Sequence, residues 1–357
     1  MRHVRALYTR YSHWGRYSGV TQLVRYLDPT RYRVHLDGAS DSDADLPLPH
    51  AGLRQRLRAR VQHRMAWYKL SDLAAELRAL PGCLMNRTDV VHFLDAEHSA
   101  QYLPQWLRRS GVSRTRTVAT FHQPPELLAQ LTDRTLVERL DCVTTVSPPQ
   151  AEYFAQFLPA SRIRVTLHGI DTDFFRPDGN GRESTPPRFR CITVGHWLRD
   201  WATLHRVAQL LASCRDIEFA IVTDRETGLE GLANVVRHRN VDDTTLLALY
   251  RQSDVLLLPV TQATANNALL EGIATGLPVV TSDIPAMRAY LRGDEGILVK
   301  DNVPGDIADA LLHLMRHPDA RRAMGRQART RAEQLSWRNV VPQWETVYDA
   351  VTGRTDE

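Results

Sequence analysis

The sequence predicts an α/β protein built from two doubly wound domains. Three observations lead to this fold class: the chain length, a repeated alternation of strands and helices, and one polar linker. At 357 residues, the chain is longer than a single hydrophobic core usually fills. Its 43% hydrophobic and 24% charged residues are typical of an ordinary globular protein. Two separate cores are therefore expected.

The first half of the chain alternates short apolar runs with longer amphipathic ones. Strands are predicted at residues 3–9, 33–37, 90–95, 117–122, 142–147 and 162–169. Helices are predicted between them, for example at residues 19–27, 69–80 and 126–140. This order implies a parallel sheet that is covered by helices.

The second half repeats this pattern after a stretch rich in Pro, Gly and charged residues. Its strands are predicted at residues 190–196, 217–224, 234–238, 254–260, 277–282 and 295–300, with helices at 244–253 and 304–317. We expect a first domain over residues 1–175, a linker over 176–188, a second domain over 189–335, and an amphipathic helix over 336–357 that returns to the first domain. Two such domains facing each other would leave a central cleft at the carboxyl ends of their strands, where open sheets of this class bind ligands.

Charge and composition exclude several classes of function. A net charge of +4 suits an anionic substrate but is too small to indicate nucleic-acid binding. The four cysteines are scattered without metal-ligand spacing, which predicts reduced thiols. The sequence has neither a membrane-spanning run nor the apolar core of a signal peptide, so a cytoplasmic protein is expected. Because its only lysines are Lys69 and Lys300, we expect phosphate contacts to come from arginine.

The residues after the predicted strand at 254–260 indicate a ligand site. Asn266 and Asn267 stand where this strand ends and a helix begins, and Gly276 terminates that helix. The free amides and the positive dipole end of a helix favour a phosphate there, and Glu271, one turn in, is placed to accept hydrogen bonds from ribose hydroxyls. The structural alternative is that Asn266 caps the helix and Glu271 is only its first-turn acid.

Several segments resemble family 4 glycosyltransferases, and they follow one another in the same order. The longest, LYRQSDVLLLPVTQATANNALLEGIATGLPVVTSDIPAMRAYL, is similar to the nucleotide-sugar-binding segment of that family. SGVTQLVRYL is similar to its N-terminal glycine loop and first helix, VVHFLD and TFHQ to its first-domain strand ends, VTLHGIDTDFFRP to its domain junction, and VGHWLRDWATL to the start of its second domain. The resemblance implies the GT-B fold, with two Rossmann-like domains, and sugar transfer with retention of anomeric configuration.

The resemblance also implies roles for particular residues. Catalytic roles fall to His122 beside the donor sugar, to Arg199 at the diphosphate, and to Glu271. The implied donor-binding residues are Ser18, Gly19, Gly195, His196, Thr264, Ala265, Asn266, Asn267, Ala268 and Glu271.

The sequence departs from the family pattern at three places. Ala263 replaces the first of two glutamates that the family usually has, so the backbone and amides of the residues after it are expected to contact the donor sugar. His196 stands where an arginine is usual, and Arg199 best matches the lysine that follows. Ser18 and Gly19 replace a pair of glycines, and Gly19 still permits close approach of the backbone.

These features predict a metal-independent, retaining glycosyltransferase that moves a sugar from a nucleotide-sugar donor to a small-molecule, glycan or lipid-linked acceptor. No metal or other cofactor is expected, because positive groups of the protein can neutralise the leaving diphosphate. Two alternatives stay open. One is a sugar-nucleotide epimerase of the same fold, and the other is a catalytically silent sugar-nucleotide-binding partner of another transferase.

Other polar clusters have structural explanations. Asp41, Asp43 and Asp45 form Asp-x-Asp patterns in a polar loop and are expected to be solvated. Asp171 and Asp173 form another such pattern, but it lies at the predicted domain junction, away from the diphosphate. The remaining candidate histidines, weaker than His122, are His92, His98, His168 and His196.

An arginine-rich segment at residues 53–65 suggests a helix with an apolar stripe. Leu53, Leu57, Val61 and Met65 recur every four residues, with arginines over the remaining surface. Such a helix could make a peripheral contact with the inner face of an anionic membrane and bring the protein to a lipid-linked acceptor. The alternative is that the stripe packs on its own sheet and the arginines are solvated.

Overall fold

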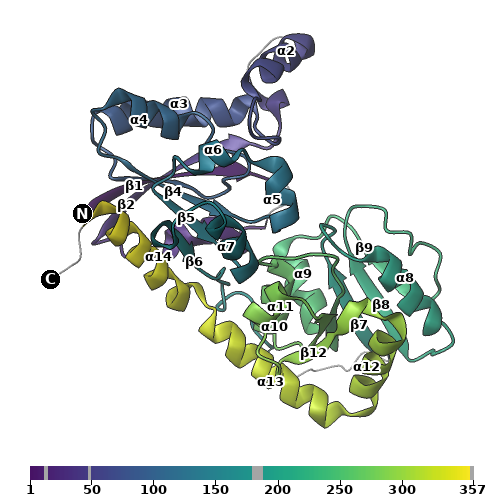
Figure 1. Ribbon diagram of the computed structural model, residues 1–357. Helices are drawn as coiled ribbons and strands as arrows, with labels where there is room; N and C mark the ends of the chain where they lie inside the picture. The colour runs from purple at the N-terminus through teal and green to yellow at the C-terminus, as the bar shows by residue number, and fades with distance from the viewer. Residues whose placement is uncertain (12–14, 47–49, 179–187, 354–357) are drawn as a thin grey trace. The chain divides into compact units, whose positions relative to one another are not determined.

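The computed structural model of the protein describes residues 1–11, 15–46, 50–178 and 188–353 and divides the chain into two compact units. Unit 1 comprises Met1–Trp14, Val20–His168 and Val340–Glu357, and unit 2 comprises Gly15–Gly19 and Gly169–Asn339. Each unit is built on one six-stranded parallel sheet with helices on both faces (Figure 1). The predicted α/β fold class, with two doubly wound sheets, is confirmed.

The sheet of unit 1 has the strand order β2-β1-β3-β4-β5-β6, and every neighbouring pair is parallel. Its strands are β1 (Arg2–Arg10), β2 (Tyr32–Ser40), β3 (Val90–Phe93), β4 (Arg116–Phe121), β5 (Cys142–Thr145) and β6 (Ile163–Val165). They confirm the six strands predicted for the first half of the chain. The strand order reverses between β1 and β3, which makes the carboxyl ends of these two strands the expected ligand site.

Helices cover both faces of this sheet. They are η1 (Val20–Gln22), α1 (Leu23–Tyr26), η2 (Asp43–Asp45), α2 (Ala51–Val61), α3 (Leu70–Leu84), α4 (Leu103–Ser110), α5 (Pro125–Leu131), α6 (Arg134–Val137), α7 (Pro148–Ala155), η3 (Ala160–Arg162) and, from Val340 onward, α14 (Trp337–Thr352). The single helix predicted at residues 126–140 is wrong, because Asp133 accepts a hydrogen bond from the Thr135 amide and starts the separate helix α6.

Successive residues of β3 face opposite layers of unit 1, as a strand requires. Val91 and Phe93 belong to the core cluster that includes residues of α3 and α4. His92 points to the other face, where its Nδ1 lies 2.7 Å from the Tyr348 hydroxyl of α14 and its Nε2 lies 2.6 Å from Thr120 Oγ1. Helix α14 therefore covers the face opposite α3 and α4 (Figure 1).

The helix α2 differs from the expected apolar stripe. It ends at Val61, and none of its residues is buried. Met65 lies beyond the helix and is 3% exposed, next to Thr132. Leu53, Leu57 and Val61 lie on α2, whereas Met65 does not, so the four apolar residues do not form one helical face.

The sheet of unit 2 has the order β9-β8-β7-β10-β11-β12, again with every neighbouring pair parallel. Its strands are β7 (Phe189–Val194), β8 (Ile217–Val222), β9 (Val235–His238), β10 (Val255–Leu258), β11 (Val279–Ser282) and β12 (Gly296–Val299). They confirm the six predicted strands. This is the 3-2-1-4-5-6 order of Rossmann domains, and it reverses between β7 and β10.

The helices of unit 2 fix the position of the residues after β10. They are α8 (Trp201–Leu210), α9 (Asp243–Arg251), α10 (Asn267–Ala274), α11 (Pro285–Tyr290), η4 (Lys300–Asn302), α12 (Pro304–Arg316) and α13 (Pro318–Gln334). Val255 and Leu257 of β10 pack in the core cluster with residues of α8 and α12. Leu256 meets α10 instead, and a Cβ on Gly272 would lie 2.7 Å from its Cδ2. This close approach sets the depth of α10 against β10.

The boundaries of the two units differ from the expected ones. Unit 1 gives way to unit 2 between His168 and Gly169, earlier than the expected boundary at residue 175. Unit 2 also takes Gly15–Gly19 from the N-terminal part of the chain. Most of the expected linker, residues 179–187, lies outside the described residues. Among the residues that the structure describes, no helix has both the length and the apolar composition needed to cross a membrane.

Candidate functional site

The loops after β7 and β10 meet where the strand order of unit 2 reverses. Gly195 follows β7 with a φ of 80°, a conformation that favours glycine. A Cβ at this position would lie 3.1 Å from Nη2 of Arg199. The same Nη2 lies 3.4 Å from Oδ1 of Asn266, which follows β10. The fold thus brings Gly195 and Arg199 of one loop next to Asn266, which is 67 residues after Arg199 in the sequence.

Arg199 holds the loop after β7 through its guanidinium group. Its Nη2 and Nε donate to the carbonyl oxygen of Val194 over 2.7 and 3.0 Å, and its Nη1 donates to that of Trp197 over 3.0 Å. Burial lowers the pKa of Arg199 to about 10, which leaves the group charged at neutral pH. Because these hydrogen bonds go to neutral oxygens, the positive charge is available to an anion.

The start of α10 combines a cap with free helical amides. Asn266 caps the helix, since its side chain accepts a hydrogen bond from the Leu269 amide over 3.2 Å. The amides of Asn267 and Ala268 lie in the first turn, where an α-helix offers no carbonyl partner for them. Thr264 is buried and Ala265 half-buried in the loop that leads to the cap. The capping role of Asn266 is therefore confirmed, and it is compatible with a phosphate at the same helix end.

Glu271 is a buried carboxylate with two hydroxyl partners. It is 4% exposed, and its Oε2 accepts a hydrogen bond from the Tyr250 hydroxyl over 2.8 Å. Its Oε1 accepts another from the Ser18 hydroxyl over 2.5 Å. Burial raises the pKa of Glu271 above its usual value, although both hydrogen bonds and the nearby Arg199 oppose the shift. The interpretation as a first-turn acid is wrong, because Glu271 lies in the second turn of α10.

The segment Gly15–Gly19 places Ser18 against Glu271. The Arg16 amide donates to Oδ2 of Asp243 over 2.7 Å, and the Tyr17 ring stacks on Phe174 with 3.7 Å between ring centroids. Gly19 has a φ of 90°, so the chain turns there in a way that a larger residue would strain. The sequence indicated Ser18 and Gly19 through the family resemblance, and the structure adds the direct bond to the carboxylate.

In unit 1, His122 directly follows β4 at the carboxyl edge of the sheet. Its Nε2 lies 2.7 Å from the carbonyl oxygen of Leu94, which accepts the Nε2 proton. The backbone amides of His122 and Gln123 donate to one carboxylate oxygen of Glu97, the second over 2.7 Å. Burial raises the pKa of Glu97. The residues after β3 therefore hold both the ring and the backbone of His122.

A second polar group lies at the same edge, where the strand order of unit 1 reverses. The Tyr11 hydroxyl, after β1, lies 2.7 Å from Nε2 of His98, and Nζ of Lys69 lies 3.2 Å from its Nδ1. Lys69 also pairs with Asp72 over 3.3 Å. Burial lowers the pKa of His98 to about 3, so its ring is neutral. Sequence reasoning missed Tyr11, Lys69, Glu97 and Tyr250, because contacts between distant residues leave no local pattern.

The remaining candidate histidines are placed as follows. His92 has structural partners on both ring nitrogens, and burial lowers its pKa to about 3. The ring centroid of His168 lies 6.2 Å from that of His122. His196 is half-buried in the loop after β7. Of the four, His98, His168 and His196 lie close to predicted or newly found site residues, and His92 belongs to the core.

The Asp-x-Asp carboxylates serve local structure. Asp171 accepts the amides of Asp173 and Phe174 over 3.1 and 3.0 Å, and Asp173 pairs with Arg338 over 2.6 Å. Asp43, expected to be solvated, is half-buried and accepts the Ser71 amide over 3.2 Å at the start of α3. Within the described ranges, no group of three or more His, Cys, Asp or Glu side chains is arranged to hold a metal ion.

Comparison with known proteins decides the family. Residues 18–174 match the family model described as Glycosyltransferase Family 4, and residues 190–317 match the one described as Glycosyl transferases group 1. Together the two models account for most of the chain. The chain belongs to the family 4 glycosyltransferases. The resemblance inferred from the sequence motifs is thereby confirmed.

Curated proteins that are similar in sequence match part of this glycosyltransferase. A D-inositol 3-phosphate glycosyltransferase of Paenarthrobacter aurescens is 38% identical over 215 residues, which are 54% of this chain and 53% of that protein. A protein of the same name from Corynebacterium jeikeium is 34% identical over 208 residues, which are 49% of this chain and 48% of that protein. The chain thus spans about half the length of the curated relatives that it matches.

Solved structures cover nearly the whole chain at low sequence identity. Sucrose-phosphate synthase of Thermosynechococcus elongatus matches with a TM-score of 0.74 and 16% identity over 99% of this chain and 100% of its own. Anabaena HepE in complex with UDP-glucose matches with a TM-score of 0.68 and 14% identity over 96% of this chain and 99% of its own. At such identity the likeness establishes the fold alone, which is the GT-B fold predicted from the sequence.

The burial of Glu271 predicts a stability that depends on pH. Because burial raises its pKa in the folded protein above the ordinary value of about 4.5, the folded state binds more protons than the unfolded state, and the free energy of unfolding falls as pH rises above that value. Glu271→Gln has no side-chain proton to lose, so its free energy of unfolding should not show this fall with pH. We expect the variant to melt above the parent protein at pH 8, with a smaller difference at pH 5, in scanning calorimetry. The exposed Glu152→Gln is the control, and an equal difference at both pH values would contradict the buried-charge account.

The placement of His122 predicts a separation of catalysis from nucleotide binding. Since His122 follows β4 in unit 1, whereas the predicted nucleotide-binding loops belong to unit 2, His122→Ala should lower kcat by roughly tenfold or more through lost positioning. The affinity for a free nucleoside diphosphate, measured by calorimetry, should stay unchanged. His35→Ala, on an exposed part of β2, is the control. Equal losses of kcat and of nucleotide affinity would argue against this role.

Proposed function

We propose that the protein transfers a sugar from a nucleoside-diphosphate sugar to an acceptor, with retention of anomeric configuration and without a metal ion. The observation that carries the proposal is the cluster at the strand reversal of unit 2, where Gly195, Arg199 and the capped start of α10 converge. Solved structures of the same fold contain UDP or UDP-glucose, which makes a uridine diphosphate sugar the first donor to test.

The chemistry of the reaction explains why these residue types are needed. Breaking the bond between the anomeric carbon and the diphosphate oxygen leaves negative charge on the departing diphosphate. Arg199 supplies a fixed positive charge, and the first-turn amides of Asn267 and Ala268 supply oriented donors at the positive end of the α10 dipole. This neutralisation by the protein supports a metal-independent reaction.

Glu271 and Ser18 are proposed to hold the ribose. The carboxylate already binds two hydroxyl groups, so a ribose hydroxyl can take the place of the Ser18 hydroxyl without a change in hydrogen-bond chemistry. Loss of charged hydrogen bonds of this kind costs about 1.5 to 3 kcal/mol. The acceptor is proposed to bind unit 1 at the edge that carries His122, and the names of the curated relatives make an inositol phosphate the first acceptor to test.

The proposal is tested by donor binding followed by a transfer assay. We expect UDP or a UDP-sugar to raise the melting temperature of the protein, as any ligand of the folded state does. Sugar transfer should persist in excess chelator, and Arg199→Ala should lower turnover by on the order of a hundredfold. Arg206→Ala, exposed on α8, is the matched control and should keep full turnover.

Other outcomes of this assay would identify the alternative functions. Donor binding without turnover on any acceptor would indicate a catalytically silent partner of another transferase. The replacement of the family's first glutamate by Ala263 supports this alternative. Formation of an epimeric sugar without acceptor would indicate an epimerase. Activity abolished by chelator and restored by manganese would contradict the metal-independent mechanism.

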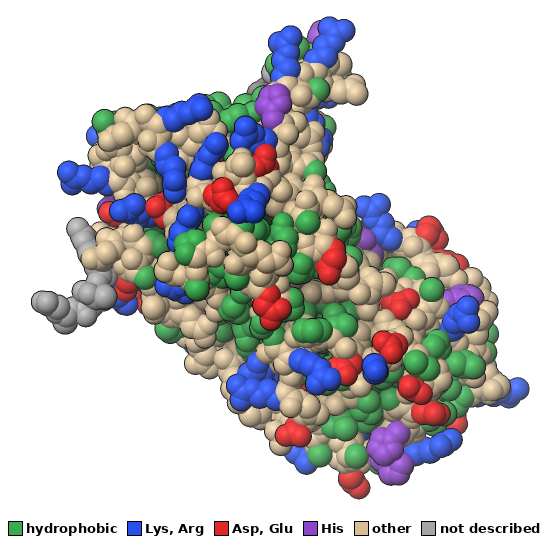
Figure 2. All heavy atoms as spheres, in the orientation of Figure 1, with side chains coloured by type: hydrophobic (Ala, Val, Ile, Leu, Met, Phe, Trp, Pro, Cys, Tyr) green, Lys and Arg blue, Asp and Glu red, His purple; other side chains and the backbone are tan. Residues whose placement is uncertain are grey.

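A peripheral contact of α2 with an anionic membrane is proposed as well. The eleven residues of α2 include four arginines and no acid, and none of them is buried. Figure 2 shows Lys or Arg side chains at the end of unit 1 where Figure 1 places α2. Leu53 is 42% exposed among these arginines, as in helices that lie in a membrane interface.

The charge on α2 predicts salt-sensitive vesicle binding. We expect the protein to sediment with phosphatidylglycerol vesicles at low salt, and Arg56→Gln combined with Arg60→Gln should release most of it. High salt should have the same effect, because surface charges are screened. The control Arg206→Gln with Arg215→Gln removes the same charge from unit 2 and should bind as the parent does. A parent protein that ignores such vesicles would end this proposal.

A further inference from the structure

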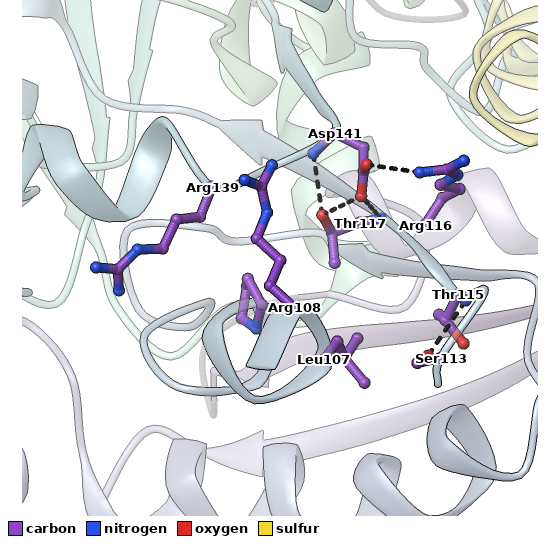
Figure 3. A pocket seen from close by; sticks show the side chains of 9 residues that line it. Leu107, Arg108, Ser113, Thr115, Arg116, Thr117, Arg139 and Asp141 are labelled. Atoms are coloured by element: carbon purple, nitrogen blue, oxygen red, sulfur yellow. Dashed lines mark hydrogen bonds and ion pairs between the residues drawn. The ribbon is translucent and has the colours of Figure 1, made fainter. Parts of the chain in front are cut away.

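A hollow lies in unit 1 at the amino-terminal edge of the sheet. It has a volume of about 390 Å³, and Pro104 and Leu107 of α4 form part of its wall. Arg116 at the start of β4 and Asp141 just before β5 also line it (Figure 3). His122 follows β4 at the opposite, carboxyl-terminal edge of the same sheet. The hollow is therefore distinct from the proposed sugar-transfer site, and its size is in the range of small-molecule pockets.

Positive charge around this hollow exceeds negative charge. Arg108 and Arg139 both line it. Nη1 of Arg139 donates to the neutral Gln105 side chain over 2.5 Å. In the part of the chain that the structure describes, the guanidinium group of Arg108 makes no hydrogen bond or ion pair. Figure 3 shows its side chain pointing from α4 toward the loop that carries Asp141.

The one acid of the hollow is already engaged. Asp141 Oδ2 accepts hydrogen bonds from the amide and the hydroxyl of Thr117, both over 2.8 Å. Its Oδ1 pairs with Nη1 of Arg116 over 3.2 Å. Asp141 is thus committed to Thr117 and Arg116, which leaves the charges of Arg108 and Arg139 without an acidic partner in this hollow.

A third arginine lies beside this group. Nη2 of Arg162 donates to the carbonyl oxygen of Glu138 over 2.7 Å and to that of Leu140. Burial and the nearby charge of Arg108 lower the pKa of Arg162. Burial is the larger cause of this shift, and repulsion between the two arginines adds to it. A bound anion would relieve that repulsion.

The position of Arg108 at the end of α4 does not explain the cluster. A basic residue in the last turn of a helix interacts favourably with the helix dipole, and this accounts for Arg108 alone. Arg139 and Arg162 come from the segments before β5 and β6. Arg108 and Arg139, from separate parts of the chain, line the same hollow, and Arg162 lies near Arg108.

We propose that this hollow binds the phosphate group of a phosphorylated ligand. Arginine presents a planar set of donors that matches phosphate oxygens. A phosphorylated small molecule and the phosphate of a lipid headgroup offer the same chemistry. The inference is independent of the sugar-transfer proposal. The hollow lies at the edge of the unit 1 sheet opposite His122, and the proposed diphosphate site belongs to unit 2.

The test uses hydrogen–deuterium exchange and calorimetry on the full chain with inorganic pyrophosphate at low salt. We expect pyrophosphate to slow exchange in residues 104–117 and 139–142. Arg108→Gln combined with Arg139→Gln should abolish this protection and weaken the pyrophosphate affinity of the hollow by roughly tenfold or more. Arg215→Gln, exposed in unit 2, should change neither.

Two further variants keep the result interpretable. Arg199→Ala should retain the protection of residues 104–117, which separates this hollow from the diphosphate site of unit 2. Arg108→Gln alone alters an exposed side chain and should fold as the parent does, so a reduced protection in this variant reports on binding.

A lipid arm distinguishes the two ligand sources. Two variants are mixed with phosphatidate vesicles. The first carries Arg56→Gln and Arg60→Gln, which remove charge from α2, and the second carries Arg108→Gln and Arg139→Gln in addition. Vesicle binding that depends on Arg108 and Arg139, without protection by pyrophosphate, identifies a lipid headgroup. Protection by pyrophosphate without vesicle binding identifies a soluble ligand. Absence of both in the parent protein, or protection that survives the double variant, would overturn the proposal.

Discussion

The reversal of strand order in each sheet is the constraint on which the rest of the structure depends. On the two sides of a reversal, the connections leave toward opposite faces of the sheet. The loops that follow the two strands are therefore left open to a ligand. In unit 2 this places the loop of Gly195 and Arg199 next to Asn266. The close contact of Gly272 with Leu256 then sets how far the start of α10 extends past β10. The geometry of the proposed donor site is thus a consequence of sheet order and helix packing.

Burial of polar groups has two different purposes in this protein. His92 is enclosed, and both its ring nitrogens are matched to fixed hydroxyls of β4 and α14, so it links three elements of the core. Glu271 is enclosed as strongly, but its partners come from Tyr250 and from the short segment that carries Ser18. An ionised carboxylate without partners would be very costly to bury. Hydroxyl partners satisfy it and yet remain exchangeable for those of a sugar.

Much of the fold followed from the sequence because local patterns determine it. Most strands in the described residues contain apolar runs, and Asn266 and Gly276 mark the two ends of α10 by cap chemistry that acts within a few residues. The failures have a physical reason too. Asp133 competes for a backbone amide and divides one predicted helix into two. The stripe at residues 53–65 kept its period beyond the end of α2, because periodicity alone does not show where a helix stops.

The candidate site was predictable where the start of a helix after a strand or a family motif marked it. The motif indicated Ser18, Arg199 and Glu271, whereas Tyr250 and Glu97 act through contacts with residues that are distant in sequence. No periodicity or spacing records such pairs. They became visible once the strands were assembled, since the sheet brings their carboxyl ends together.

The path of the chain between the two units has a consequence for how this protein can be divided. Neither unit is a continuous stretch, because residues Gly15–Gly19 belong to unit 2 and Val340–Glu357 to unit 1. A fragment cut between residues 176 and 188 would carry Glu271 and Tyr250 but not Ser18, and its α14 would lack the sheet on which Tyr348 packs. Chimeras that exchange donor specificity by swapping the second half of the chain therefore have to exchange this short N-terminal segment with it. Unit 2 consists of two separate stretches of the chain, and an exchange at the linker alone would separate the Glu271 carboxylate from the Ser18 hydroxyl that binds it.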